Sequence, residues 1–230
     1  MKLTLSVCAA AATFVAASAC ADTVQLKYTG TGKYRTVTAA GTIFSGNVKA
    51  GELLHEAQSG NGEASVLSGT ISTFCTELTQ SVTTSFKTYT IRTVDQAPRP
   101  GGGMGGDKAG LIYDLYNGAA ERQYESNDKA AAFQLLIWEI VYDYNGSSLS
   151  SIDYSVGALR FTNLGSGVVT WFNTFKALLG QHTVALYLRA ATNDTKQDQL
   201  IRIPTQVPLP GSIGLGIMGL SVMGLRRRVR

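Results

Sequence analysis

The stretch DKAAAFQLLIWEIVYDY, residues 128–144, decides how the rest of the chain must fold. It predicts a helix that is capped by Ser126 or Asn127 and stops at Asn145-Gly146. Gln134 and Trp138 share one face of this helix, and bulky apolar residues fill the adjacent face. A helix that is apolar over so much of its circumference must be buried, and Gln134 is buried with it. A buried amide needs hydrogen-bond partners or costs about 1–3 kcal/mol.

The segments on either side of this helix predict an α+β fold, a β-sandwich or barrel with inserted helices. Alternating apolar residues between glycines indicate short strands over residues 24–44, and further strands are expected at 71–78 and 85–94. Helical spacing appears at 108–118 and 168–179, so the helical insertion covers about 107–180. Strands are expected again at 183–189 and 200–203.

Charge is concentrated at the two ends of the chain. The net charge is +4, but five of the 20 Lys and Arg residues are Lys2 and the arginines of the last five positions. All 16 Asp and Glu residues lie between Asp22 and Asp198, so the body between the ends is close to neutral. Basic termini are typical of targeting signals, and we expect no nucleic-acid binding.

Residues 1–21 have the features of a secretory signal peptide. Lys2 is followed by an apolar stretch from Leu3 to Ala17, which is too short to span a membrane, and then by Ala-Cys-Ala at 19–21. Cleavage after Ala21 makes Asp22 the first residue of the exported body. Lipidation of Cys20 is the alternative.

Residues 206–230 are expected to sort the protein to a membrane. An apolar segment, 211–225, follows Pro208 and Pro210 and precedes an arginine cluster, which consists of Arg226, Arg227 and Arg228 with Arg230 beyond it. As a helix the segment reaches about 22 Å, short of the roughly 30 Å hydrocarbon core. The arginines favour the cytoplasmic side. We expect a short C-terminal transmembrane helix that acts as a sorting tag, with a plain single-span anchor as the alternative.

This order of parts resembles the PEP-CTERM sorting signal of Gram-negative bacteria. The resemblance implies processing by an exosortase-type membrane protease. It also implies passage through the inner membrane to the cell surface or to a matrix of extracellular polysaccharide.

Cys75 is the single cysteine of the exported body, because Cys8 and Cys20 lie in the signal peptide. A lone thiol outside the cell is liable to oxidation unless it is buried or chemically used. A buried, inert cysteine is the simplest interpretation. Neither histidine, His55 or His182, has a second ligand at metal spacing, so we expect no metal and no cofactor. A hydrolase that pairs Cys75 with one of these histidines is a distant alternative.

Two motifs contain Cys75 and Gln134: Phe74-Cys75, and Phe-Gln-Leu-Leu-Ile-Trp at 133–138. Over residues 70–145 they resemble the thioester domains of bacterial surface adhesins, which implies an internal thioester between Cys75 and Gln134. Gln80 is the competing partner. The short complement-type spacing places glutamine three residues after cysteine, where this chain has Leu78, so Gln134 is preferred.

The implied chemistry makes the protein a covalent adhesin that acts once for each bond and not an enzyme. Cys75 attacks the amide carbon of Gln134 and ammonia leaves. Three aromatic residues are the expected apolar shield against water: Phe74, Phe133 and Trp138. An amine or hydroxyl of extracellular polysaccharide or of a surface protein then attacks the thioester. Gln134 is left joined to that partner.

The sequence thus predicts a signal peptide (1–21), a thioester-type domain (22–205) and a sorting segment (206–230). An alternative from another class is a structural or carbohydrate-binding module of the extracellular matrix. In that case Cys75 and Gln134 merely pack.

Overall fold

Residues 21–185 and 187–204 are described by a computed structural model of the chain. The expected signal peptide up to residue 20 and the expected sorting segment with its transmembrane helix lie outside these residues. Within the described part, no helix is long and apolar enough to cross a membrane.

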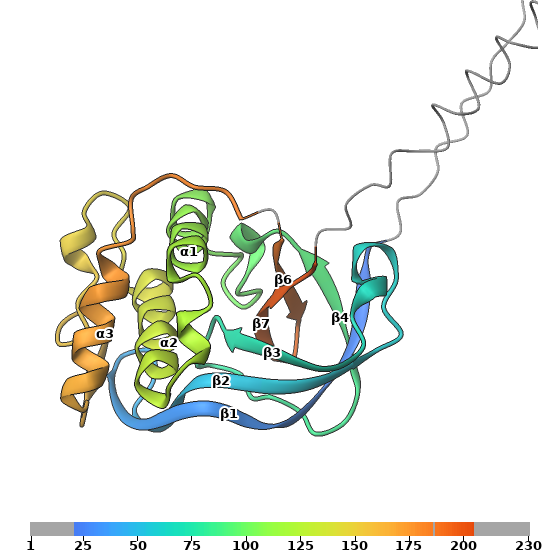
Figure 1. Cartoon of the computed structure of the whole chain (residues 1–230), viewed down its shortest axis with the longest axis horizontal. Helices are drawn as coiled ribbons and strands as arrows, with labels where there is room; N and C mark the ends of the chain where they lie inside the picture. The colour runs from blue at the N-terminus through green and yellow to red at the C-terminus, as the bar shows by residue number, and fades with distance from the viewer. Residues whose placement is uncertain (1–20, 186, 205–230) are drawn as a thin grey trace, which may run out of the picture.

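The described chain is a mixed α/β structure with a large antiparallel sheet (Figure 1). The sheet order is β2-β3-β7-β6-β4-β1-β5, and β1 also pairs with β2, so the pairings close a ring. The strands are β1 (Thr23–Gly41), β2 (Gly46–Gln58), β3 (Gly69–Cys75), β4 (Lys87–Arg92), β5 (Leu159–Thr162), β6 (Leu188–Asn193) and β7 (Lys196–Arg202).

Strand β1 closes the ring because it bends and pairs with three neighbours. Its first residues pair with β4, its length pairs with β2 and its last residues pair with β5. Two register shifts interrupt the β1–β2 pairing, between Tyr28 and Gly30 and between Thr31 and Tyr34, and such irregularities bend a strand. The partner strand passes very close here. A Cβ atom on Gly51 would lie 2.3 Å from the carbonyl oxygen of Lys33.

Three helices lie on one side of the ring in the described residues: α1 (Gly106–Ala119), α2 (Asn127–Tyr142) and α3 (Ser166–Lys176) (Figure 1). Helix α2 is capped by the Ser126 hydroxyl, which accepts a hydrogen bond from the backbone N–H of Lys129. Every residue of α2 from Ala130 to Val141 is buried. Helix α2 packs against α3, β1 and β2, so the expectation of a buried central helix is confirmed.

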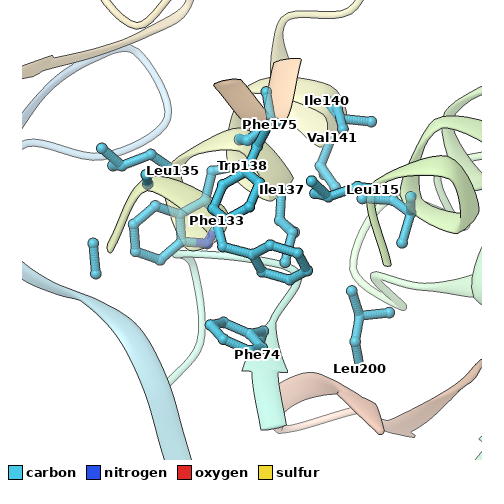
Figure 2. Packing of buried hydrophobic residues seen from close by; sticks show 14 of the residues in the cluster. Phe74, Leu115, Phe133, Leu135, Ile137, Trp138, Ile140, Val141, Phe175 and Leu200 are labelled. Atoms are coloured by element: carbon cyan, nitrogen blue, oxygen red, sulfur yellow. The ribbon is translucent and has the colours of Figure 1, made fainter. Parts of the chain in front are cut away.

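Two apolar cores fill the molecule. The larger core lies between α2 and the sheet, where Phe74 of β3, Phe133 of α2, Leu115 of α1 and Leu200 of β7 meet (Figure 2). The smaller core gathers residues from five strands of the ring, Val24 and Tyr89 among them. The first core fixes the position of α2 relative to β3, and these two elements carry the candidate site.

The structure differs from the expected strands in three places. The short strands expected over residues 24–44 are one long strand, β1, and the strand that follows it, β2, was not expected. Residues 183–185 are not a strand, and the Asp114 carboxylate, which accepts hydrogen bonds from the backbone N–H groups of residues 180–183, holds the start of this segment as a loop. The strand starts instead at Leu188. Strand β5 was not expected. It has four residues, too few for a clear alternating pattern.

Candidate functional site

Cys75 is the last residue of β3, and the pairing with β7 fixes its place. Phe74 lies opposite Leu200 and Cys75 lies opposite Gln199. Successive side chains of a strand point to opposite faces. Phe74 packs on α2, with its ring centroid 4.8 Å from that of Phe133. That contact places the end of β3 beside the turn of α2 that carries Gln134.

Cys75 and Gln134, 59 residues apart in sequence, are in direct contact. The backbone N–H of Cys75 donates to Oε1 of Gln134 at 3.0 Å, and Nε2 of Gln134 donates to the Cys75 carbonyl at 2.8 Å. The thiol Sγ lies 3.5 Å from the same Oε1. The two residues are 4% and 0% exposed. The structure therefore brings the two residues of the expected thioester within reach of each other.

The thiol of Cys75 is protonated at neutral pH. Burial raises its pKa to about 12, and the negative charge of Glu77 adds to the rise. The indole N–H of Trp138 acts in the opposite direction, although it makes no hydrogen bond of normal geometry. A neutral buried thiol is protected from oxidants, and its proton must move elsewhere when the sulfur reacts.

A pocket of about 330 Å³ opens beside the thiol, and we call it the Cys75 pocket. This volume is at the lower end of the range for ligand sites, which starts near 300 Å³. Cys75 itself forms part of the lining, so the buried sulfur lies at a cavity and not inside solid core. Three aromatic residues and three amides line the pocket: Tyr28, Phe44 and Trp138, and Asn47, Gln80 and Gln197.

The three residues of the expected apolar shield have different positions. Trp138 is fully buried, lines the Cys75 pocket and stacks on Phe161 with a centroid distance of 5.7 Å. Phe74 and Phe133 are also fully buried, but they pack on each other in the larger core and are not part of the pocket lining (Figure 2). Trp138 therefore lies at the pocket together with Cys75, and the two phenylalanines belong to the core that positions β3 and α2.

The two histidines lie in different surroundings. His55 is buried among the ring strands, where its Nδ1 is 3.1 Å from the Thr73 hydroxyl, and burial lowers its pKa to about 4. His182 is exposed in the loop held by Asp114. Across residues 21–185 and 187–204, the Cys75 thiol makes its hydrogen bond to Gln134, and neither histidine takes part in that contact. The same residues contain no group of three His, Cys, Asp or Glu side chains that could hold a metal ion.

Sequence reasoning missed most of the pocket. Gln80 was considered as an acyl partner, but its amide donates to the Asp194 carbonyl at 2.9 Å and its side chain lines the pocket. Gln197 of β7 donates to the Glu77 carbonyl at 2.9 Å and also lines the pocket. Tyr142 accepts the backbone N–H of Leu78 at 2.9 Å and so ties the segment after Cys75 to α2. No local motif marks these residues, since each acts through a partner far away in sequence.

No known protein family matches this chain, and no curated protein or solved structure is detectably similar to it. What the site does therefore has to follow from its own geometry and chemistry.

Proposed function

We propose that this chain is an exported surface or matrix protein in which Cys75 and Gln134 form an internal thioester. The protein then attaches covalently to an amine or hydroxyl on the matrix or on a cell surface. One observation carries the proposal: a buried thiol lies 3.5 Å from the carbonyl oxygen of a buried glutamine amide, at the edge of a pocket. Export through residues 1–21 and sorting through residues 206–230 belong to the same proposal and rest on the sequence.

The contacts of Gln134 support formation of the bond. The backbone N–H of Cys75 donates to the amide oxygen, which is where negative charge develops when sulfur attacks the adjacent carbon. The carbonyl of Cys75 fixes the amide nitrogen and so prevents the side chain from rotating away. A bond forms between Sγ and the amide carbon, and the carbon–nitrogen bond breaks. The nitrogen takes the thiol proton and leaves as ammonia.

The pocket supports the second step. A nucleophile that enters it attacks the thioester carbon, the carbon–sulfur bond breaks, and the proton of the nucleophile passes to Sγ. Gln134 ends as an ester or amide of the partner, and Cys75 returns to the thiol. Trp138 and the burial of both residues limit access of water, which would otherwise hydrolyse the thioester and leave a glutamate at position 134. Each molecule reacts once, so this chemistry is attachment and not turnover.

The second candidate function is a non-covalent structural or carbohydrate-binding module of the matrix. It is favoured by the observation that both polar atoms of the Gln134 amide already pair with the Cys75 backbone. That pairing satisfies a buried amide without any reaction. The aromatic residues of the pocket also suit a sugar ring. The two candidates differ in one covalent bond.

Intact mass separates these candidates. The exported body purified under mildly acidic conditions should be lighter than its sequence by one ammonia. Reaction with methylamine should then add the mass of one methylamine to this lighter form. The Cys75→Ala and Gln134→Ala variants should have their full sequence masses and should not react. Gln80→Ala is the matched control, because it removes the competing glutamine and should keep the deficit. If the wild-type protein has its full sequence mass and forms no adduct with methylamine, the non-covalent module is the function that remains.

A further inference from the structure

The lining of the Cys75 pocket is almost free of charge. Among the described residues that form it, Lys49 carries a positive charge and none is an Asp or Glu. A protein lysine is an ammonium ion at neutral pH, and it has to lose its hydration and a proton before it can attack. The pocket offers no carboxylate for that ion, and Lys49 adds repulsion. A neutral nucleophile meets neither obstacle.

Two buried polar atoms on pocket residues have no hydrogen-bond partner. They are the donor Nε1–H of Trp138, which acts on the Cys75 thiol but makes no hydrogen bond of normal geometry, and the acceptor Oε1 of Gln80. Trp138 is fully buried, so water does not reach its indole nitrogen. Unpaired buried polar groups are costly, and a ligand that pairs with them recovers that cost. The chemistry of these atoms therefore specifies the ligand.

A hydroxyl group matches both atoms, whereas an ammonium group matches one. A hydroxyl oxygen accepts from Trp138 and its hydrogen donates to Gln80, or two neighbouring hydroxyls divide these roles. The ammonium ion that a lysine carries at neutral pH has three donors and no acceptor, so it leaves the Trp138 N–H unpaired until it loses a proton. The three aromatic residues add apolar faces on which the carbon face of a sugar ring packs.

We propose that the Cys75 pocket selects a carbohydrate hydroxyl, so that Gln134 becomes linked to a sugar as an ester and not to a lysine as an amide. This inference rests on the proposed thioester. In the transfer step the sugar oxygen bonds to the side-chain carbon of Gln134 and the carbon–sulfur bond breaks. The hydroxyl proton passes to Sγ of Cys75.

The test is a competition in one tube. The exported body is incubated with Nα-acetyl-lysine methylamide and an equal concentration of one glycoside. The glycoside is methyl glucoside in one reaction and methyl galactoside in a second. The two adducts are separated by intact mass, and hydroxylamine at alkaline pH confirms the ester because it cleaves esters and spares amides. We expect the sugar ester to exceed the lysine amide by at least about tenfold, the ratio that corresponds to one well-made hydrogen bond.

Two variants test the assignment of the polar atoms. Trp138→Phe removes the N–H and keeps an aromatic ring, and it should lower the ratio of ester to amide about tenfold. Gln80→Glu supplies a carboxylate for an ammonium ion and should shift the ratio toward the lysine adduct. The matched controls are Trp171→Phe and Gln58→Glu, which change the same residue types outside the pocket and should leave the ratio unchanged. If Trp138→Phe fails to fold, Gln80→Glu, at the pocket edge, still decides.

Failure of this inference can be told apart from failure of the proposed function. A protein with the ammonia deficit that reacts faster with lysine than with both glycosides keeps the thioester and overturns the selection of hydroxyls. A ratio that neither pocket variant changes also overturns it. A protein without the ammonia deficit overturns both.

Discussion

Two helices of this molecule each use one buried polar side chain to hold a distant piece of backbone. On α1, the Asp114 carboxylate accepts hydrogen bonds from four consecutive N–H groups, those of residues 180–183. On α2, the Gln134 amide pairs with the N–H and the carbonyl of Cys75. The Asp114 contact is a structural clamp, to which the Thr183 hydroxyl adds a further hydrogen bond at 2.8 Å. The Gln134 contact has a thiol at 3.5 Å and a pocket of about 330 Å³.

The difference between these contacts indicates what the Gln134 site is for. Asp114 shows that the fold fixes a loop to a helix without a cysteine. If Gln134 were also a plain clamp, any small apolar residue would serve at position 75 and solid packing would be better than a pocket. The proposed function accounts for a thiol, a glutamine amide and a pocket at one place by a reaction between them.

The largest expected effect is the loss of the cross-link in Cys75→Ala. A bond that joins residues 59 positions apart stabilises a chain by about 4 kcal/mol, by the loop-entropy argument used for disulfides. Chemical denaturation should show that loss in the variant and the same loss in wild-type protein treated with methylamine, which opens the bond and keeps the cysteine. A loss of about 1 kcal/mol in the variant, with no effect of methylamine, would mean that Cys75 merely packs.

Asp114→Ala should destabilise the protein by about 2–3 kcal/mol, because several N–H groups lose a charged acceptor. Burial alone would raise the pKa of Asp114, but its hydrogen bonds to Thr183, Gln181 and His182 outweigh burial and lower it. Its contribution is therefore present above pH 4 or so and is lost in acid. The ammonia deficit should persist in this variant. Asp194→Ala, with a side chain 85% exposed, is the control and should change stability little. If Asp114→Ala also lost the ammonia deficit, the Asp114 and Gln134 contacts would depend on each other, and the distinction drawn between them would be wrong.

Glu139 on α2 offers a pH-dependent test of the buried helix. Burial first, and then the charge of Asp143, raises its pKa to about 9, while Lys176 opposes the rise. The folded state therefore holds a proton that the unfolded chain releases above its ordinary pKa of 4.5, so stability falls as pH rises from there toward 9. Glu139→Gln should be more stable than wild type by about 2 kcal/mol at pH 8 and equal to it at pH 4. Equal denaturation curves at both pH values would show that Glu139 is ionised in the fold.

The smallest effect concerns the segment that follows Cys75. Tyr142→Phe removes the acceptor of the Leu78 N–H and should cost about 1 kcal/mol. Leu78 lines the Cys75 pocket, so the looser segment should also speed the reaction with methylamine. Stopped-flow or quenched mass measurements give that rate, and Tyr144→Phe, two residues beyond the end of the same helix, is the comparison. An unchanged rate would mean that this segment does not control access to the sulfur.

Local patterns predicted the elements of the site but not its surroundings. Helix α2 was expected because its apolar residues and its cap lie within one continuous stretch. Cys75 was expected on a strand because the pattern that indicates the strand is also local. The closed ring depends on the bends of β1, and a sequence pattern does not fix where two register shifts fall. The pocket depends on Tyr28, Phe44 and Gln197, which come from three separate strands or turns. The strand that was expected from residue 183 starts only at Leu188. The Asp114 carboxylate holds residues 180–183 as a loop and so overrides the β-propensity at the start of the expected strand.

The most direct test is to look for the bond itself by peptide mapping. The exported body should be digested at mildly acidic pH without reducing agents or amines, which preserves a thioester, and the peptides analysed by tandem mass spectrometry. We predict one branched species that contains both Cys75 and Gln134 and is lighter than the two peptides together by one ammonia. Two separate linear peptides, one with a free thiol at Cys75 and one with an intact amide at Gln134, would contradict the account.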